Sequence, residues 1–325
     1  MPTMTPSSLS PLAATGAPAS RARALLRRSL RWRLQCAGLA LAGLVYLAGA
    51  GPTLAEPSAE PPRRVVSINL CTDQLAMLIA APGQLVSVSR FARDPGMSLM
   101  TAEADRFPIN HGLAEEVFRL EPDLVLAGTF TKRATVNLLR RLDRRVEEFA
   151  PANDFDDIRA AVRRMGALLG QETRAQALIA GLDAELAAAR EHAGRPRPTP
   201  APVIGSFAAN SFTTGDGTLE NAIVTRAGYR HLGADLGLAG TTRLPLEALV
   251  LADPDYLLVW ERYASDPSRA AAVVRHPALE ARFGETRRVA ADTRAWICGT
   301  PLTASAITRL RAAVDAVTPR REAAR

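Results

Sequence analysis

Two distant segments of the chain repeat the same order of residue types. In residues 115–127 a glutamate lies seven positions before a Pro-Asp pair, and an apolar run follows the pair. In residues 247–260 another glutamate lies seven positions before a second Pro-Asp pair, which also leads into an apolar run. This repeat predicts two similar lobes that carry an acidic residue at the same place. A protein with two matched lobes usually binds its ligand in the gap between them.

Each copy of the repeat has the pattern of a short helix, a tight turn and a buried strand. A proline cannot continue a helix, and it forces the residue before it out of the helical conformation. The apolar run after each Pro-Asp turn is typical of a parallel strand that is buried on both faces. The alternative is that such units recur throughout α/β proteins, and that the helix dipole alone favours a glutamate near a helix start.

Predicted strands and helices alternate in both halves of the chain, which indicates an α/β fold with parallel-type central sheets covered on both faces. In the first half we expect strands at 64–68, 85–89 and 124–127, helices at 75–81 and 134–142, and a loop at 90–108. In the second half we expect strands at 203–207, 256–260 and 288–291, a loop at 208–217, and helices at 219–227 and 303–314.

A proline-free segment lies between the two halves. Its apolar residues fit a helical period, and Gly170 divides it into two predicted helices. The second helix, at 172–192, would be roughly 30 Å long and would act as a rigid spacer. The alternative is that it packs on one lobe alone. We predict six regions: a signal peptide at 1–55, a disordered connector at 56–63, an N-terminal α/β lobe at 64–155, linker helices at 156–194, a C-terminal α/β lobe at 195–318 and a tail at 319–325.

The positive charge of the chain is concentrated near its N-terminus. The formal net charge is +7, but residues 1–55 carry six arginines and no acidic residue. The remainder is therefore almost neutral. It also has no basic stripe interleaved with aromatic residues, which argues against nucleic-acid binding.

The first 55 residues have the pattern of an export signal. A basic region at 21–33 precedes an apolar stretch at 34–50, and Thr53-Leu54-Ala55 supplies small residues for cleavage before Glu56. We therefore expect a mature protein outside the cytoplasm. The alternative is a retained anchor, because the apolar stretch approaches membrane-spanning length.

Motifs of the common enzyme classes do not occur in the sequence. It has no glycine-rich phosphate loop, no HExxH zinc motif, no CxxC pair and no GxSxG elbow. The histidines, at positions 111, 192, 231 and 276, do not have metal-ligand spacing. We therefore predict a binding protein and not an enzyme, with no cofactor and no metal site.

Polar and aromatic residues follow several of the predicted strands. Ligands of parallel sheets bind beyond the carboxyl ends of the strands, so these residues are candidates for ligand contact. Aromatic residues at such ends suit a large or ring-bearing ligand. The alternative is that each caps the core of its own sheet. The predicted cleft residues are Asn69, Cys71, Arg90, Phe130, Ser211, Phe212, Trp260, Tyr263 and Trp296.

Residues 64–318 resemble the periplasmic substrate-binding proteins of ABC importers for cobalamin and ferric siderophores. The resemblance rests on residues 64–68, the glutamate repeat, residues 217–221 with Ala227-Gly228, and Trp296 before the last helix. It implies a class III periplasmic binding protein-like fold, with two lobes joined by a single long helix. It also implies a periplasmic monomer that captures an iron chelate or a corrinoid and delivers it to an ABC permease with its ATPase.

The same resemblance implies roles for four further side chains. Glu115 and Glu247 would dock onto arginines of the permease, one from each lobe. The chain departs from the family at Leu113 and Ala114, where an asparagine is common. Cys71 and Cys298 would lie at the mouth of the cleft, one in each lobe. A disulfide between them would lock the cleft, so we expect reduced thiols or separate buried positions.

Two other functions stay open on the sequence. A haem-binding protein of the same fold would need an axial ligand such as Tyr263 or His231. An exported enzyme or sensor would need a reactive group in the cleft, such as Cys71 beside a histidine.

Overall fold

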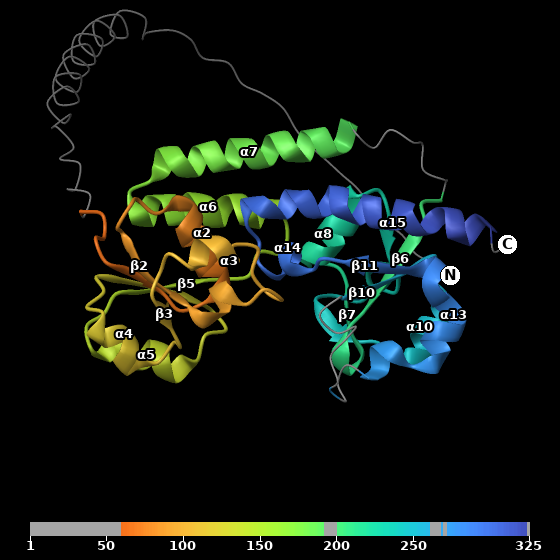
Figure 1. Ribbon diagram of the computed structural model, residues 1–325, viewed down its shortest axis with the longest axis horizontal. Coiled ribbons are helices and arrows are strands. Elements are labelled where there is room, and N and C mark those ends of the chain that lie inside the picture. Colours follow the sequence, from red (N-terminus) through yellow and green to blue (C-terminus); the bar gives the residue numbers. More distant parts are fainter. Residues whose placement is uncertain (1–59, 192–199, 261–267, 269–271, 324–325) are drawn as a thin grey trace, which may run out of the picture. The chain divides into compact units, whose positions relative to one another are not determined.

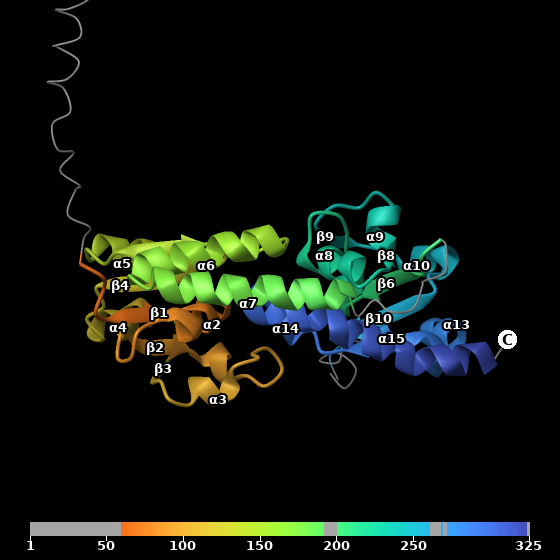
Figure 2. The same ribbon diagram turned by 90° about the horizontal axis from the view of Figure 1, so that it is seen from above.

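The computed structural model describes residues 60–191, 200–260, 268 and 272–323. These residues belong to one compact unit, Glu60–Arg325, in which two sheets are each flanked by helices (Figures 1 and 2). The predicted signal peptide at 1–55 lies outside the described residues. Within the described part of the chain, no helix is both long enough and apolar enough to cross a membrane.

The first lobe is built on a five-stranded parallel sheet with the order β3-β2-β1-β4-β5. The chain starts in the middle of this sheet, moves to one side, and then crosses to the other side at β4. The strands are β1 (Val65–Ser67), β2 (Leu85–Ser89), β3 (Ile109–Asn110), β4 (Leu124–Gly128) and β5 (Val146–Phe149). The helices are α2 (Leu70–Ile79), η1 (Arg90–Arg93), α3 (Thr101–Ala104), α4 (Ala114–Arg119) and α5 (Arg133–Arg141).

The second lobe has a four-stranded parallel sheet with the order β11-β10-β6-β8 and a separate antiparallel pair, β7 with β9. Its strands are β6 (Val203–Phe207), β7 (Phe212–Thr214), β8 (Arg230–His231), β9 (Thr241–Arg243), β10 (Tyr256–Trp260) and β11 (Arg288–Ala291). Its helices are η2 (Ala209–Ser211), α8 (Leu219–Arg226), α9 (Leu232–Asp235), α10 (Leu246–Ala252), η3 (Val273–Arg275) and α13 (Pro277–Arg287).

Two long helices follow the first lobe, and a third ends the chain. α6 (Phe155–Leu169) is capped by the Asp154 carboxylate and ends at Gly170, whose φ of 65° is left-handed. The predicted break at this glycine is therefore confirmed. α7 (Glu172–Glu191) packs along α6 (Figure 1). After β11 the chain forms α14 (Arg294–Ile297) and η4 (Pro301–Ala304), which contacts α6 and α7, and then α15 (Ser305–Ala323).

The first-lobe sheet is buried on both faces, as its apolar strands predict. Val65 of β1 belongs to the main core, which also contains residues of α6, α7, β6 and α15. Val66, the next residue, points to the opposite face and joins a smaller cluster with Val117 and Val136. Neighbouring side chains of one strand therefore lie in separate cores. The α/β prediction with parallel central sheets is confirmed.

The two copies of the sequence repeat have the same local structure. Glu121 and Asp253, which precede the two prolines, both adopt left-handed conformations with φ of 48° and 44°. The aspartate of each Pro-Asp pair then binds the start of its lobe's first strand. The Asp123 carboxylate accepts hydrogen bonds from the Arg63 and Arg64 amides, and the Asp255 carboxylate accepts one from the Val203 amide. In each lobe the repeat thus supplies a carboxylate that holds the start of the first strand.

Several elements were not predicted from the sequence. Residues 90–108, predicted as a loop, contain η1 and α3, and residues 208–217 contain η2 and β7. β5 and α13 also had no predicted counterpart. Glu147 and Glu148 interrupt the apolar pattern of β5, and their carboxylates are held by arginines, including Arg140 and Arg164. Ion pairing along an edge strand therefore replaces the apolar alternation by which strands are recognised.

Candidate functional site

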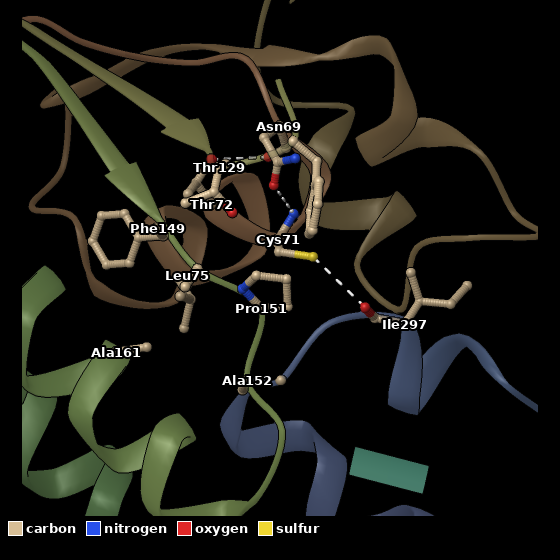
Figure 3. Close-up of a pocket in the computed structure, with 14 residues that line it drawn as sticks. Asn69, Cys71, Thr72, Leu75, Thr129, Phe149, Pro151, Ala152, Ala161 and Ile297 are labelled. Atoms are coloured by element: carbon tan, nitrogen blue, oxygen red, sulfur yellow. Dashed lines mark hydrogen bonds between the residues drawn. The ribbon is translucent and has the colours of Figure 1, made fainter. Parts of the chain in front are cut away.

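The main candidate site is a pocket at the carboxyl ends of β1, β4 and β5, with a volume of about 200 Å³. In the first-lobe sheet β1 and β4 are neighbours, and the chain changes direction between them. This is the switch point at which open parallel sheets bind ligands. The lining residues are Asn69, Cys71, Thr72, Leu75, Gly128, Thr129, Phe130, Phe149, Ala150, Pro151, Ala152, Ala161, Ile297 and Gly299 (Figure 3).

Local capping holds Asn69 at the rim of the pocket. Its side-chain oxygen accepts a hydrogen bond from the Cys71 amide at 3.0 Å, so Asn69 begins α2 (Figure 3). The end of β4 lies against the same side chain. A Cβ atom at Gly128 would lie 2.7 Å from the Asn69 Nδ2, so a larger residue here would force the Asn69 side chain to shift. Asn69 therefore contributes to the pocket by fixing the start of α2 and by contacting the end of β4.

The lining of the pocket is neutral and largely apolar. None of the described lining residues is an aspartate, glutamate, lysine, arginine or histidine. Its polar side chains are those of Asn69, Thr72 and Thr129. Phe130 is 87% exposed although it is aromatic, which leaves its ring available to a ligand. Among the described residues, no group of three or more His, Cys, Asp or Glu side chains is placed to hold a metal ion.

Cys71 and Cys298 form a disulfide, with their Cα atoms 5.0 Å apart. The expectation of reduced or separate cysteines was therefore wrong. The position of Cys298 explains the error, since its segment packs on the first lobe. A Cβ atom at Gly299 would lie 2.3 Å from the Cβ of Ala152. The bond thus ties α2 to the segment between α14 and η4, and Cys298 itself is buried.

The other predicted cleft residues whose side chains the structure describes do not line this pocket. Arg90 is exposed at the end of β2, with its guanidinium 4.5 Å from the ring centre of Phe91. Ser211 has a left-handed backbone with φ of 60°. The guanidinium of Arg243 lies 5.5 Å from the ring centre of the next residue, Phe212. Trp296 packs against the main core. Tyr263 and the side chain of Trp260 lie outside the described residues.

One wall of the pocket was not predicted from the sequence. It is formed by the residues that follow β5, from Phe149 to Ala152, and by Ala161 of α6. Because β5 was not recognised as a strand, its carboxyl end was not considered. The pair Ala150-Pro151 directly after an apolar residue was the available signal, since proline often follows the end of a strand or helix. Ile297 lies in the segment that follows the strand at 288–291, whereas Gly299 had no comparable signal.

Asp73, beside the pocket on α2, is a fully buried carboxyl group. Its oxygens accept hydrogen bonds from the Ser89 amide at 3.0 Å and the Ser89 hydroxyl at 2.5 Å. Burial raises the pKa of Asp73 to about 7, although these hydrogen bonds oppose the shift. The side chain therefore links the start of α2 to the end of β2 within the first lobe.

His231 is a buried structural residue of the second lobe. Its Nε2 lies 3.3 Å from the Glu220 carboxylate and 3.2 Å from the Thr214 hydroxyl, while its Nδ1 accepts from the Gly233 amide. Burial alone would raise the pKa of Glu220, but the hydrogen bond and charge of His231 hold it below its usual range. Both ring nitrogens are engaged, so His231 is not available as an axial ligand.

The two repeated glutamates are exposed and lie in the first turns of matched helices. Glu115 is on α4 and Glu247 is on α10. Figure 1 shows α4 and α10 on the same side of the unit, away from α7. No residue that the structure describes forms an ion pair or hydrogen bond with either carboxylate. The neighbouring Glu116 differs, because its carboxylate binds the His111 amide and ring.

Known proteins share both sequence and fold with this chain. The sequence profile of a periplasmic binding protein family matches residues 65–294. A cobalamin-binding protein of Halobacterium salinarum is 28% identical over 204 residues, which cover 61% of this chain and 53% of the relative. The chain thus spans about half the length of the curated relatives it matches.

Solved structures extend the likeness to the whole fold. A periplasmic heme-binding protein from Roseiflexus is 23% identical, with a TM-score of 0.63 over 79% of this chain and 99% of its own. The vitamin B12 binding protein BtuF of Vibrio cholerae is 16% identical, with a TM-score of 0.59 over 79% of this chain and 98% of its own. The prediction of a class III periplasmic binding protein-like fold is confirmed. With its profile match over residues 65–294, this chain belongs to the periplasmic binding protein family.

Proposed function

We propose that this protein is the exported substrate-binding component of an ABC importer. It captures an iron chelate or a corrinoid at the pocket beside β1, β4 and β5, and delivers it to the permease in the inner membrane. The proposal includes a cleavable signal peptide at 1–55 and a mature, monomeric protein in the periplasm. The export pattern of the leader and the membership of a periplasmic family both support this location.

The neutral lining of the pocket is the observation that carries the proposal. A bare metal ion is bound by carboxylate, imidazole or thiolate groups, and the described lining offers none of these as free groups. An organic ligand instead suits apolar walls, an exposed aromatic ring such as Phe130, and a few hydrogen-bonding groups. The cargo is therefore an organic molecule or an organic chelate of a metal.

The thiol enzyme or sensor loses its proposed reactive group, and the haem binder loses one of its two candidate ligands. The thiol enzyme or sensor requires a free Cys71, and this residue is bonded to Cys298. The haem binder requires an axial ligand; one candidate, His231, is buried with both ring nitrogens engaged, and the other, Tyr263, lies outside the described residues. We therefore propose a binding role without catalysis.

The repeated glutamates fit the delivery step. Glu115 and Glu247 have exposed carboxylates on matched helices of the two lobes. Two fixed charges give orientation and faster encounter more than they give affinity. We propose that each carboxylate pairs with an arginine of the permease.

A ligand panel tests this function. The mature protein would be titrated with cyanocobalamin, three ferric siderophores of different chelating groups, and haem, with binding followed by calorimetry and tryptophan fluorescence. We expect one siderophore or the corrinoid to bind with a Kd of about 1 μM or lower, which corresponds to about −8 kcal/mol. Tight binding of haem alone, or no binding by any member, would contradict the proposal.

A further inference from the structure

Exposed apolar side chains accompany both repeated glutamates. On α10, Leu251 is 85% exposed and follows Glu247 by four residues. On α4, Phe118 is 37% exposed and follows Glu115 by three residues, and Leu113 is 51% exposed at the start of the helix. Residues three or four apart lie on the same face of a helix. Each lobe therefore presents a free carboxylate and an apolar group side by side.

Folding does not account for the two exposed leucines. Leucine is a poor N-cap, and Leu113 forms no side-chain cap for α4. Leu251 gains little burial, because most of its side chain stays in water. A single exposed leucine is ordinary on a protein surface. The same combination on both copies of a duplicated element, on one side of the unit, instead indicates a shared contact surface (Figure 1).

We propose that Leu113, Phe118 and Leu251 are apolar contact residues for the ABC permease, beside the arginines that would pair with Glu115 and Glu247. This inference rests on the proposed function and extends its docking step. A protein partner with basic and apolar groups fits both features of the surface. An anionic lipid surface does not, since it would repel the two carboxylates.

The charged and apolar residues should act on different rate constants. Long-range attraction by the glutamates raises the association rate and is screened by salt. Burial of the apolar side chains slows dissociation and depends little on salt. Removing one well-buried leucine contact is expected to speed dissociation about tenfold.

The full mature protein provides the test, with the permease–ATPase complex that imports its cargo held in lipid nanodiscs. Association and dissociation rates would be measured at low and high salt. We expect Leu251→Ser and Phe118→Ala to raise the dissociation rate about tenfold at both salt concentrations. Glu115→Ala with Glu247→Ala should mainly lower the association rate at low salt.

Phe91→Ala is the matched control for Phe118→Ala. Both rings are 37% exposed and both carry an arginine guanidinium, that of Arg90 at 4.5 Å and that of Arg144 at 4.7 Å from the ring centre. Phe91 lies on η1, outside the proposed surface, and its variant should dock like the wild type. Leu113→Asn should stabilise the fold by capping α4 and yet weaken docking, which a purely structural role would not produce.

The outcomes separate this inference from the proposed function. Weaker docking in the glutamate variant, with unchanged docking in the leucine and phenylalanine variants, would overturn the inference alone. No docking of the wild type, or docking that all variants leave unchanged, would overturn the docking step as a whole. The wild type could instead bind empty nanodiscs or associate with itself. If Leu251→Ser abolished that binding without affecting docking, the surface would belong to another occupant and the inference would be overturned.

Discussion

At the scale of single residues, burial decides what the polar side chains of the first lobe do. Asp73 lies on α2 between the pocket residues Thr72 and Leu75, but its carboxyl group accepts hydrogen bonds from Ser89, and burial raises its pKa to about 7. Asn69 is also used locally, as the cap of α2. The side chains left for a ligand are then the neutral ones, among them Phe130, which is 87% exposed.

The raised pKa of Asp73 predicts a pH-dependent stability. The folded protein keeps the proton up to pH of about 7, whereas an exposed aspartate loses it near 3.9. Between these values the folded state binds more protons, so stability falls as the pH rises. Urea unfolding of the wild type and of Asp73→Asn should show a difference in free energy that changes by about 2–4 kcal/mol from pH 4 to pH 7. Parallel curves for the two proteins would show that the pKa of Asp73 is the same in the folded and unfolded states.

Single residues also show how far a sequence rule can place side chains. The positions of Asn69, Cys71 and Phe130 in the pocket follow from a rule about strand ends, which needs no knowledge of packing. Trp296 follows a strand as well, but its ring packs against the main core. Which way a partly buried aromatic side chain points depends on the elements around it, and a single sequence does not contain that information.

At the scale of elements, the segment from α14 to η4 is the least expected feature. It follows the last strand of the second lobe but packs against α6 and α7, and Gly299 fits closely against Ala152 and Ile158. Contacts of this kind join residues far apart in the sequence. The pairing of Cys71 with Cys298, 227 residues apart, could not be predicted for the same reason.

The disulfide should stabilise the mature protein. It closes a loop of 227 residues, and removal of such a bond typically lowers the free energy of unfolding by about 2–5 kcal/mol. We expect a reductant to lower the thermal midpoint of the wild type. The Cys71→Ser, Cys298→Ser double variant should have a similarly low midpoint that the reductant does not change. A wild-type midpoint that stays constant while mass spectrometry detects two free thiols would argue against this stabilisation.

Two glycines in different elements should respond in opposite ways to alanine. At Gly299 a methyl group would lie 2.3 Å from the Ala152 Cβ, so Gly299→Ala is expected to lower the free energy of unfolding by about 1–3 kcal/mol. At Gly181, inside α7, a methyl group meets nothing within 4 Å, and Gly181→Ala should raise the free energy of unfolding by about 0.5–1 kcal/mol. Chemical denaturation of both variants measures these opposite changes in stability. Equal effects would mean that the α14–η4 segment is not tightly packed.

At the scale of the whole molecule, duplication organises the fold. Each lobe repeats a helix, a left-handed residue before proline, and an aspartate that holds the lobe's first strand. This pattern was visible in the sequence because it depends on short spacings. The shared core through α6, α7 and α15 was not visible, because it joins residues from both halves of the chain.

We propose that an organic cargo binds in the pocket at the ends of β1, β4 and β5. Calorimetry with two phenylalanine variants tests this binding site through the affinity of each variant for the cargo. Phe130 lines the pocket and is 87% exposed, while Phe118 is 37% exposed and lies outside it on α4. We expect Phe130→Ala to weaken binding about tenfold, or about 1.4 kcal/mol, and Phe118→Ala to leave the affinity unchanged. Unchanged affinity in Phe130→Ala, or equal losses in both variants, would mean that the cargo does not bind in this pocket.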